Sequence, residues 1–354
     1  MNLLFKNPPM IETEEFDVVI EGTDFLCFLE FLNVKNTNKI AFVDDSEFCG
    51  TSFTTKQLKK SISKFINELV IRKNTNKDVI LEILPILINK DNKLIEIVEN
   101  SAFSESIDYV KIKDFYFICQ NRDIFKIPYT STDIYENEWF LNTFNDPKDD
   151  KMNLNDVYLY SKALKNNNLK IFLDNTKNKE SILYKLGLHG IIDTNLYNNN
   201  LKYPQYGLGS IAEYLSLHYS MQGIVFCVNK NLRKDCNNKI SYKLEDAELV
   251  AKNIIKPDYQ HGKVFIRVIM CEMNKLKGNF KAFLECDEIL TVLGFNNLTQ
   301  CCPCGYQLLY FIKQKKHVTD EDIKIFKIDL EKVELDISYE ICLNLFEYDK
   351  IINE

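Results

Sequence analysis

The sequence is poor in several residue types and patterns that mark whole classes of protein. Its 354 residues include 11 glycines, 8 prolines, one tryptophan and four histidines. No apolar run approaches the roughly 20 residues that span a bilayer, and the apolar stretch near Met1 is too short for a signal peptide. Basic residues number 44 against 51 acidic ones, so the net charge of −7 provides no basic surface for phosphates. We therefore expect a soluble intracellular protein that does not bind nucleic acid.

The motifs of common enzyme classes are also missing. The chain has no P-loop, no His-Glu-x-x-His and no serine or cysteine placed by a motif next to a histidine. The four histidines are dispersed along the chain; they are His189, His218, His261 and His317. His218 has the helical spacing of a core or boundary residue. These absences predict a protein that is not an enzyme.

The 11 cysteines are mostly single residues within apolar stretches, which is typical of reduced core cysteines. The exception is the cluster Cys301-Cys302-Pro303-Cys304. A structural zinc site needs a second pair of ligands at similar spacing, and only His317 follows nearby. We interpret the cluster as a thiol-rich loop and expect no metal site.

The clearest structural unit begins near residue 16. Residues 16–20 have the continuous apolar character of a buried parallel strand, Gly22 lies in a turn, and residues 25–32 have the composition of a buried helix. A second strand is predicted at residues 39–43, followed by Asp44. Strand, turn, helix, strand and acid together predict a βαβ unit with the layout of a dinucleotide-binding fold.

The glycine pattern of that turn is degenerate. Of the three glycines in Gly-x-Gly-x-x-Gly only Gly22 is present, while Asp24 and Cys27 occupy the other two positions. Asp24 brings a negative charge to a place that would have to hold a pyrophosphate, and its expected role is the N-cap of the following helix. We therefore expect no cofactor, although a flavin-dependent oxidoreductase stays open as an alternative.

The rest of the chain alternates between helical and strand-like segments. Helices are predicted at residues 55–72 and 93–100, strands near 79–88 and 109–111, and a β-hairpin over 115–127. Residues 128–200 are rich in asparagine and have helical spacing only.

From residue 203 a tight Gly-Leu-Gly turn precedes a helix to about residue 222, with Ser210 and Glu213 spaced as a capping box. Strands follow near 224–228, 264–270, 281–284, 289–293 and 307–312. We predict an α/β protein whose large domain comprises residues 1–128 and 201–354, with mixed β-sheets, and whose small all-α domain is inserted at 129–200.

Together with Lys126-Ile127-Pro128 after the hairpin, three segments resemble the Rab GDP-dissociation inhibitors and Rab escort proteins. The most specific is Tyr-Pro-Gln-Tyr-Gly-Leu-Gly at residues 203–209; the second is the block at residues 43–50, in which Asp44, Phe48 and Gly50 match the family; the third is Gly22-Thr23. The likeness covers most of residues 15–130 and 200–350. It departs from the family at Cys49, where a tyrosine is usual, and at Leu217, where an arginine is usual.

The resemblance implies a large domain with the fold of FAD-linked reductases but without their catalysis. It also implies a protein, expected to be monomeric, that binds GDP-bound prenylated Rab GTPases, shields their geranylgeranyl lipid and contacts membranes transiently. The implied Rab-binding platform comprises Asp44, Phe48, Cys49, Gly50, Tyr206, Ser210, Glu213, Tyr214 and Leu217. The region for the Rab tail would be Tyr109, Val110, Phe115 and Tyr116. The prenyl pocket would be lined by Trp139, Phe140, Phe144, Tyr158, Leu159, Leu164, Ile182, Leu183 and Leu186, which could equally form the core of the insert.

Within this family the inhibitor branch is favoured, because the chain is short and lacks the long insertions of escort proteins. A Rab escort protein, which is the accessory component of Rab geranylgeranyltransferase, is the first alternative. A degenerate member that has lost Rab binding is another, because the departures at Cys49, Ser210 and Leu217 replace polar residues of the family.

Overall fold

The computed structural model describes residues 12–34, 36, 39–44, 46, 49–54, 57, 66–88, 93–101, 107–112, 114–118, 124–127, 201–228, 240–243, 247–256, 263–273, 276, 278–285, 289–313 and 316–342. The predicted helical insert at residues 129–200 lies outside this part of the chain. Among the described residues, no helix is both long and apolar enough to cross a lipid bilayer.

The predicted βαβ unit is confirmed and forms the centre of a five-stranded sheet. The sheet has the order β10-β2-β1-β12-β11. Its strands are β10 (Val225–Val228), β2 (Ile40–Asp44), β1 (Glu12–Glu21), β12 (Ala247–Ile255) and β11 (Ile240–Lys243). The first four are parallel to their neighbours, and β11 is antiparallel to β12. This arrangement is a dinucleotide-binding type of sheet extended by one antiparallel strand.

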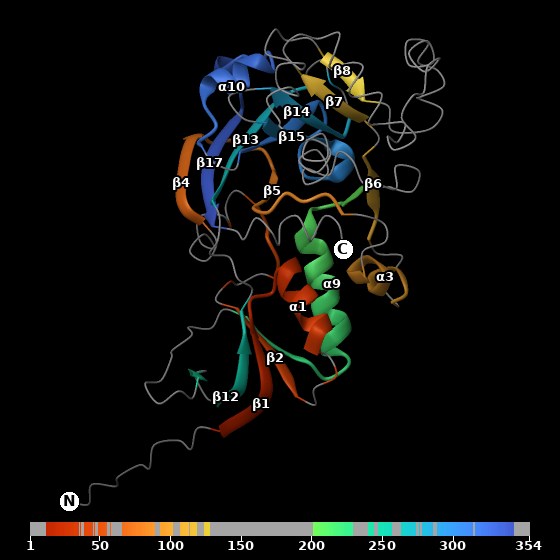
Figure 1. Cartoon of the computed structure of the whole chain (residues 1–354), viewed down its shortest axis with the longest axis vertical. Helices are drawn as coiled ribbons and strands as arrows, with labels where there is room; N and C mark the ends of the chain where they lie inside the picture. Colours follow the sequence, from red (N-terminus) through yellow and green to blue (C-terminus); the bar gives the residue numbers. More distant parts are fainter. Residues whose placement is uncertain are drawn as a thin grey trace, which may run out of the picture.

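Two helices cover one face of this sheet, α1 (Phe25–Val34) and α9 (Leu208–Ser220), which lie side by side in Figure 1. Aromatic rings fill the space between the helices and β2. The Phe28 ring lies 5.0 Å from that of Phe42, and the Phe31 ring lies 4.5 Å from that of Tyr219. Val19, Ala41 and Val43 pack on the opposite face. Because residues 18–20 of β1 and 40–43 of β2 are buried on both faces, these two segments are continuously apolar.

The second sheet has eight strands in the order β4-β17-β13-β16-β15-β14-β7-β8. The strands are β4 (Ile66–Lys73), β17 (Leu335–Cys342), β13 (Lys263–Glu272), β16 (Tyr306–Lys313), β15 (Ile289–Asn296), β14 (Phe280–Glu285), β7 (Asp114–Ile118) and β8 (Ile124–Ile127). All neighbours are antiparallel except β7 and β14. The predicted strands within residues 264–312 and the antiparallel pairing of β7 with β8 are confirmed.

One element prediction is wrong. The segment 55–72 was expected to be a helix, but its last part belongs to the edge strand β4. The spaced lysines resemble an amphipathic helix, yet Ile66, Val70 and Ile71 lie opposite residues of β17 and extend the sheet. Pairing with a strand some 270 residues away in the sequence is a tertiary effect that overrides local spacing.

Shorter elements connect the two sheets. Two small ladders join β3 (Ser52–Thr54) with β5 (Ile80–Glu82) and β6 (Tyr109–Lys111) with β9 (Lys202–Pro204). The remaining elements are α3 (Lys93–Glu99), η2 (Asn297–Thr299), α10 (Asp320–Ile325) and η3 (Leu330–Lys332). A continuous apolar core extends from α1, α3 and α9 to one face of β13, β16 and β17, and a second core lies on the other face of the large sheet.

Candidate functional site

The N-terminus of α1 is occupied by a side chain of the protein itself. The Asp24 carboxylate accepts hydrogen bonds from the backbone N–H groups of Leu26 at 2.8 Å and Cys27 at 3.1 Å. These are the amides that a bound pyrophosphate would need at the start of the first helix of a dinucleotide-binding fold. The predicted N-cap role of Asp24 is confirmed.

The acid at the end of β2 is likewise used within the protein. Asp44 is buried, and its carboxylate accepts hydrogen bonds from the Thr23 hydroxyl at 2.7 Å and from the Ser46 N–H at 3.0 Å. In the dinucleotide-binding fold an acid at this place binds a ribose hydroxyl. With Asp24 at the helix terminus and Asp44 tied to Thr23, these residues do not fit a dinucleotide cofactor bound in the usual way.

The loop after β2 instead packs against helix α9. The Gly50 N–H donates to the backbone oxygen of Thr23 at 3.1 Å. A Cβ atom added at Gly50 would lie 2.7 Å from the Gly209 Cα. Cys49 is half-buried and hydrogen-bonds with Ser216 and Thr23, and burial raises the pKa of its thiol. The structure therefore brings together the two sequence blocks that carry the family resemblance.

A buried carboxylate holds the N-terminus of α9. The Glu82 side chain accepts hydrogen bonds from the Leu208 N–H at 2.9 Å, the Ser52 hydroxyl at 2.6 Å and the Leu84 N–H at 3.1 Å. Ser52 in turn accepts from the Gly209 N–H at 2.7 Å. Burial raises the pKa of Glu82, and its hydrogen bonds with Ser52, Leu84 and Leu208 counteract that shift. Sequence reasoning missed this residue, because a cap supplied from β5 leaves no local spacing signal.

The predicted capping box at Ser210 and Glu213 is wrong. Helix α9 begins at Leu208, and its N-cap is Gly207, which has no side chain to bond to the helix. Ser210 lies inside the first turn, where its hydroxyl donates to the backbone oxygen of Gly207 at 2.7 Å. Since Glu82 already satisfies the terminal N–H of Leu208, a local capping box is not needed.

The outer side of α9 carries the predicted platform residues. Glu213 and Leu217 are exposed, Tyr214 is half-buried, and Tyr206 is exposed in the turn before the helix. Desolvation raises the pKa of Glu213. The structure adds Met221, which is 72% exposed just beyond the helix. Residues 213, 217 and 221 are spaced by four and share one helix face, a signal that the sequence already contained.

The proposed Rab-tail residues are divided between two sheets. Tyr109 and Val110 lie on β6, with Pro204 and Tyr203 of β9 as their partners, whereas Tyr116 lies on β7. The Tyr116 ring packs edge-on against Phe280 with ring centres 5.8 Å apart. The described contacts of Tyr116 are those of ordinary sheet packing.

Several predicted site residues lie outside the described part of the chain. They are Phe48 of the platform, the side chain of Phe115, and all nine residues of the proposed prenyl pocket. The cysteine cluster is described: Cys301 and Cys302 are buried, and burial raises the pKa of the Cys301 thiol to about 12 and that of Cys302 to about 11.

Comparisons with known proteins find a likeness in fold but none in sequence. No protein-family model matches the sequence, and no curated protein matches it either. Among solved structures, a Rab GDI from Plasmodium falciparum has a TM-score of 0.61 at 14% identity, covering 93% of this chain and 89% of that one. An oxidoreductase from Methanosarcina mazei has a TM-score of 0.55 at 11% identity, covering 94% of this chain and 89% of its own.

A protein from Pyrococcus furiosus has a TM-score of 0.53 at 10% identity, covering 94% of this chain and 88% of its own. At these identities the likeness concerns the fold alone. It confirms the predicted fold class, because the chain has a fold like that of Rab GDI and of FAD-linked reductases.

Proposed function

We propose that this protein is a Rab GDP-dissociation inhibitor. It binds GDP-bound prenylated Rab GTPases, shields their geranylgeranyl groups and removes them from membranes during vesicle transport. The proposal is supported by the sequence blocks at residues 43–50 and 203–209, and by the fold shared with the Plasmodium falciparum Rab GDI. In this proposal the protein is a binding chaperone in the cytoplasm, not an enzyme.

The observation that carries the proposal is the surface formed by α9 and the loop after β2. Gly50 lies against Gly209, and Cys49 contacts Ser216, so the loop after β2 packs against α9, and the candidate surface combines the half-buried Cys49 with the exposed side of α9. Leu217 and Met221 are 49% and 72% exposed on that surface. Large exposed apolar side chains beside polar ones are typical of the centre of a protein–protein interface.

The side chains on this surface differ from those of the family, so we expect the protein to prefer different Rab partners. Leu217 stands where the family usually has an arginine, and Met221 extends the same apolar face. An apolar contact to a GTPase switch segment can still select the GDP form, provided that the segment changes with the nucleotide. We therefore expect binding through apolar contacts rather than through the family's charge pairs.

The test is extraction of a Rab GTPase from membranes. Vesicles carrying prenylated Rab, loaded with GDP or with a GTP analogue, are mixed with the protein and sedimented, and Rab is measured in the supernatant. We expect release of the GDP form only. Release of neither form would contradict the inhibitor function, and binding of unprenylated Rab in the same preparation would then favour the escort role.

Substitution at Met221 locates the binding surface. We expect Met221→Glu to reduce extraction about tenfold, since burying a methionine side chain contributes about 1.5–3 kcal/mol. The matched control is Met273→Glu, because Met273 is also exposed but follows β13 in the large sheet. Equal loss of extraction in both variants would rule out α9 as the binding surface.

A further inference from the structure

The large sheet contains an unfavourable charge pair at its edge. Glu68 of the edge strand β4 and Glu340 of β17 lie directly opposite each other in the strand register. Like charges in this position destabilise a sheet, and Lys263 of β13 compensates Glu340, with its Nζ atom 2.9 Å from the Glu340 Oε1 atom. The register then passes to Ile341 opposite Ile66, so Asn67 is an extra residue in β4. Such a bulge redirects neighbouring side chains and is often found next to functional sites.

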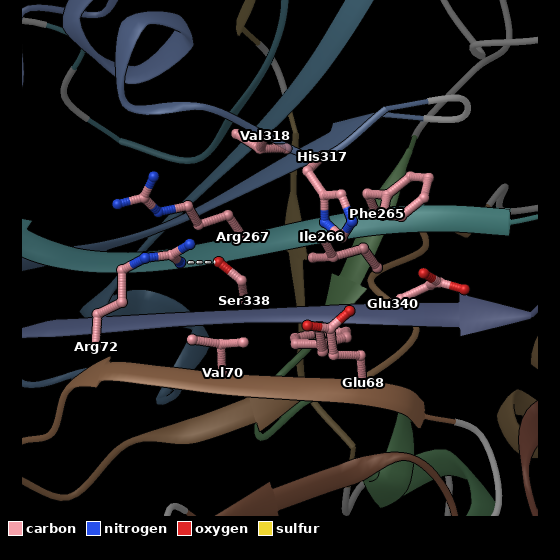
Figure 2. A pocket seen from close by; sticks show the side chains of 11 residues that line it. Glu68, Val70, Arg72, Phe265, Ile266, Arg267, His317, Val318, Ser338 and Glu340 are labelled. Carbon is pink, nitrogen blue, oxygen red and sulfur yellow. Dashed lines mark hydrogen bonds between the residues drawn. The ribbon is translucent and has the colours of Figure 1, made fainter.

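A histidine from a third segment completes the group. His317 lies between β16 and α10, and its ring centre is 4.3 Å from that of Phe265, the partner of Glu340 on β13. One side-chain ligand atom from each of Glu68, His317 and Glu340 lies within 4.8 Å of the other two. In the part of the chain that the structure describes, no other group of this kind occurs. Figure 2 shows the Glu68 carboxylate directed toward the His317 ring at a cavity of about 100 Å³.

The carboxylate of Glu340 is held in place by two side chains. Its Oε1 atom accepts hydrogen bonds from Lys263 Nζ at 2.9 Å and from Asn67 Nδ2 at 3.3 Å. Outer contacts of this kind orient the ligands of many metal sites.

One imidazole nitrogen and two carboxylate oxygens form a donor set that suits zinc and neighbouring first-row metals. We propose that Glu68, His317 and Glu340 bind a divalent transition-metal ion, with zinc as the expected ion and water in the fourth position. Ligand atoms around tetrahedral zinc lie about 3.3 Å apart, at about 2.0–2.2 Å from the ion. Glu68 and His317 are exposed, so the proposal requires their side chains to rotate until the ligand atoms reach this separation.

The ion would join three separate segments of the chain. It would tie β4, β17 and the segment before α10 together at the edge of the sheet. The site is independent of the proposed Rab-binding surface, because it belongs to the large sheet and not to α9. It also differs from the cysteine cluster at residues 301–304.

Isothermal titration calorimetry with zinc chloride, on protein first stripped with EDTA, tests the site. Because the chain has 11 cysteines, thiolates elsewhere can also bind zinc, and the comparison between variants is the decisive measurement. We expect Glu68→Gln and His317→Gln each to weaken one zinc site at least about tenfold. The control His218→Gln, on α9, should bind zinc like the wild type. Both ligand positions are exposed, so these variants should fold, which circular dichroism checks.

A thermal measurement gives a second readout. An ion that binds only the folded protein raises Tm, so zinc should raise the Tm of the wild type and of His218→Gln by more than that of the two ligand variants. Unchanged zinc affinity in both ligand variants, or the absence of any zinc binding by the wild type, would overturn the proposal.

Discussion

At the scale of single residues, Gly50 shows how a small residue joins the two halves of the candidate surface. Its φ angle of +82° lies in the left-handed region, which favours glycine. An added Cβ atom would also lie 2.7 Å from the Gly209 Cα and 3.0 Å from the Ala212 Cβ. The backbone of the loop can therefore approach α9 this closely only when residue 50 has no side chain.

We expect Gly50→Ala to lower the free energy of unfolding by about 2–4 kcal/mol, as the sum of backbone strain and displacement of α9. Gly223→Ala is the matched control, since Gly223 has a φ angle of +90° but no atom within 4 Å of the added Cβ. That variant should lose only about 1–2 kcal/mol, from backbone strain alone. Urea unfolding measures both. If the two losses are equal, the contact with α9 does not constrain the loop.

At the scale of elements, helix α9 is anchored by a residue from another segment of the chain. The Glu82 carboxylate binds the first N–H of the helix, while the Glu82 backbone oxygen accepts a hydrogen bond from the Tyr339 hydroxyl at 2.9 Å. The helix that carries Leu217 and Met221 is thus fixed to both β5 and β17. The partial positive charge at a helix N-terminus favours the ionised carboxylate, whereas burial disfavours it.

The pH dependence of stability tests the state of this carboxyl. Burial raises the pKa of Glu82 above the ordinary 4.5, so the folded protein binds the proton more tightly than the unfolded chain does. The protonated Glu82 carboxyl therefore contributes fully to stability below pH 4.5, and this contribution is lost as the pH rises through the folded-state pKa of Glu82. Relative to Glu82→Gln, the wild type should lose up to about 1.4 kcal/mol per pH unit in that window. Urea unfolding at a series of pH values measures the difference, and a constant difference would contradict the prediction.

At the scale of the whole molecule, the chain has a fold like that of FAD-linked reductases. The groups that would bind phosphate and ribose in that fold are hydrogen-bonded within the protein itself. Asp24 caps α1, and Asp44 binds Thr23 and Ser46. The apolar core remains continuous from α1 and α9 to the large sheet. Apolar packing therefore connects the two sheets through these helices.

We expect the purified protein to show no flavin absorbance, and added FAD to leave its Tm unchanged. A ligand at 100 times its dissociation constant would stabilise the folded state by about 2.7 kcal/mol, which a thermal scan detects. A yellow preparation, or a rise in Tm with FAD, would favour the oxidoreductase alternative over the proposed binding function.

The sequence by itself determined the βαβ opening, most strands of the large sheet and the cap at Asp24. These features depend on local composition, because continuous apolar runs and a residue placed directly before a helix act on their own neighbours. The turn at Tyr206 was predicted in the same way, whereas Leu217 was singled out by the family resemblance. Their membership of one surface with Cys49 and Gly50 came from the family resemblance.

Only the tertiary structure decided the features that depend on distant partners. Edge strand β4 exists because β17 pairs with it, and α9 begins at Leu208 because Glu82 of β5 supplies its cap. The group of Glu68, His317 and Glu340 likewise appears only when three segments meet. Such contacts have no local spacing pattern, since their energy is gained only after the chain has closed the intervening loops.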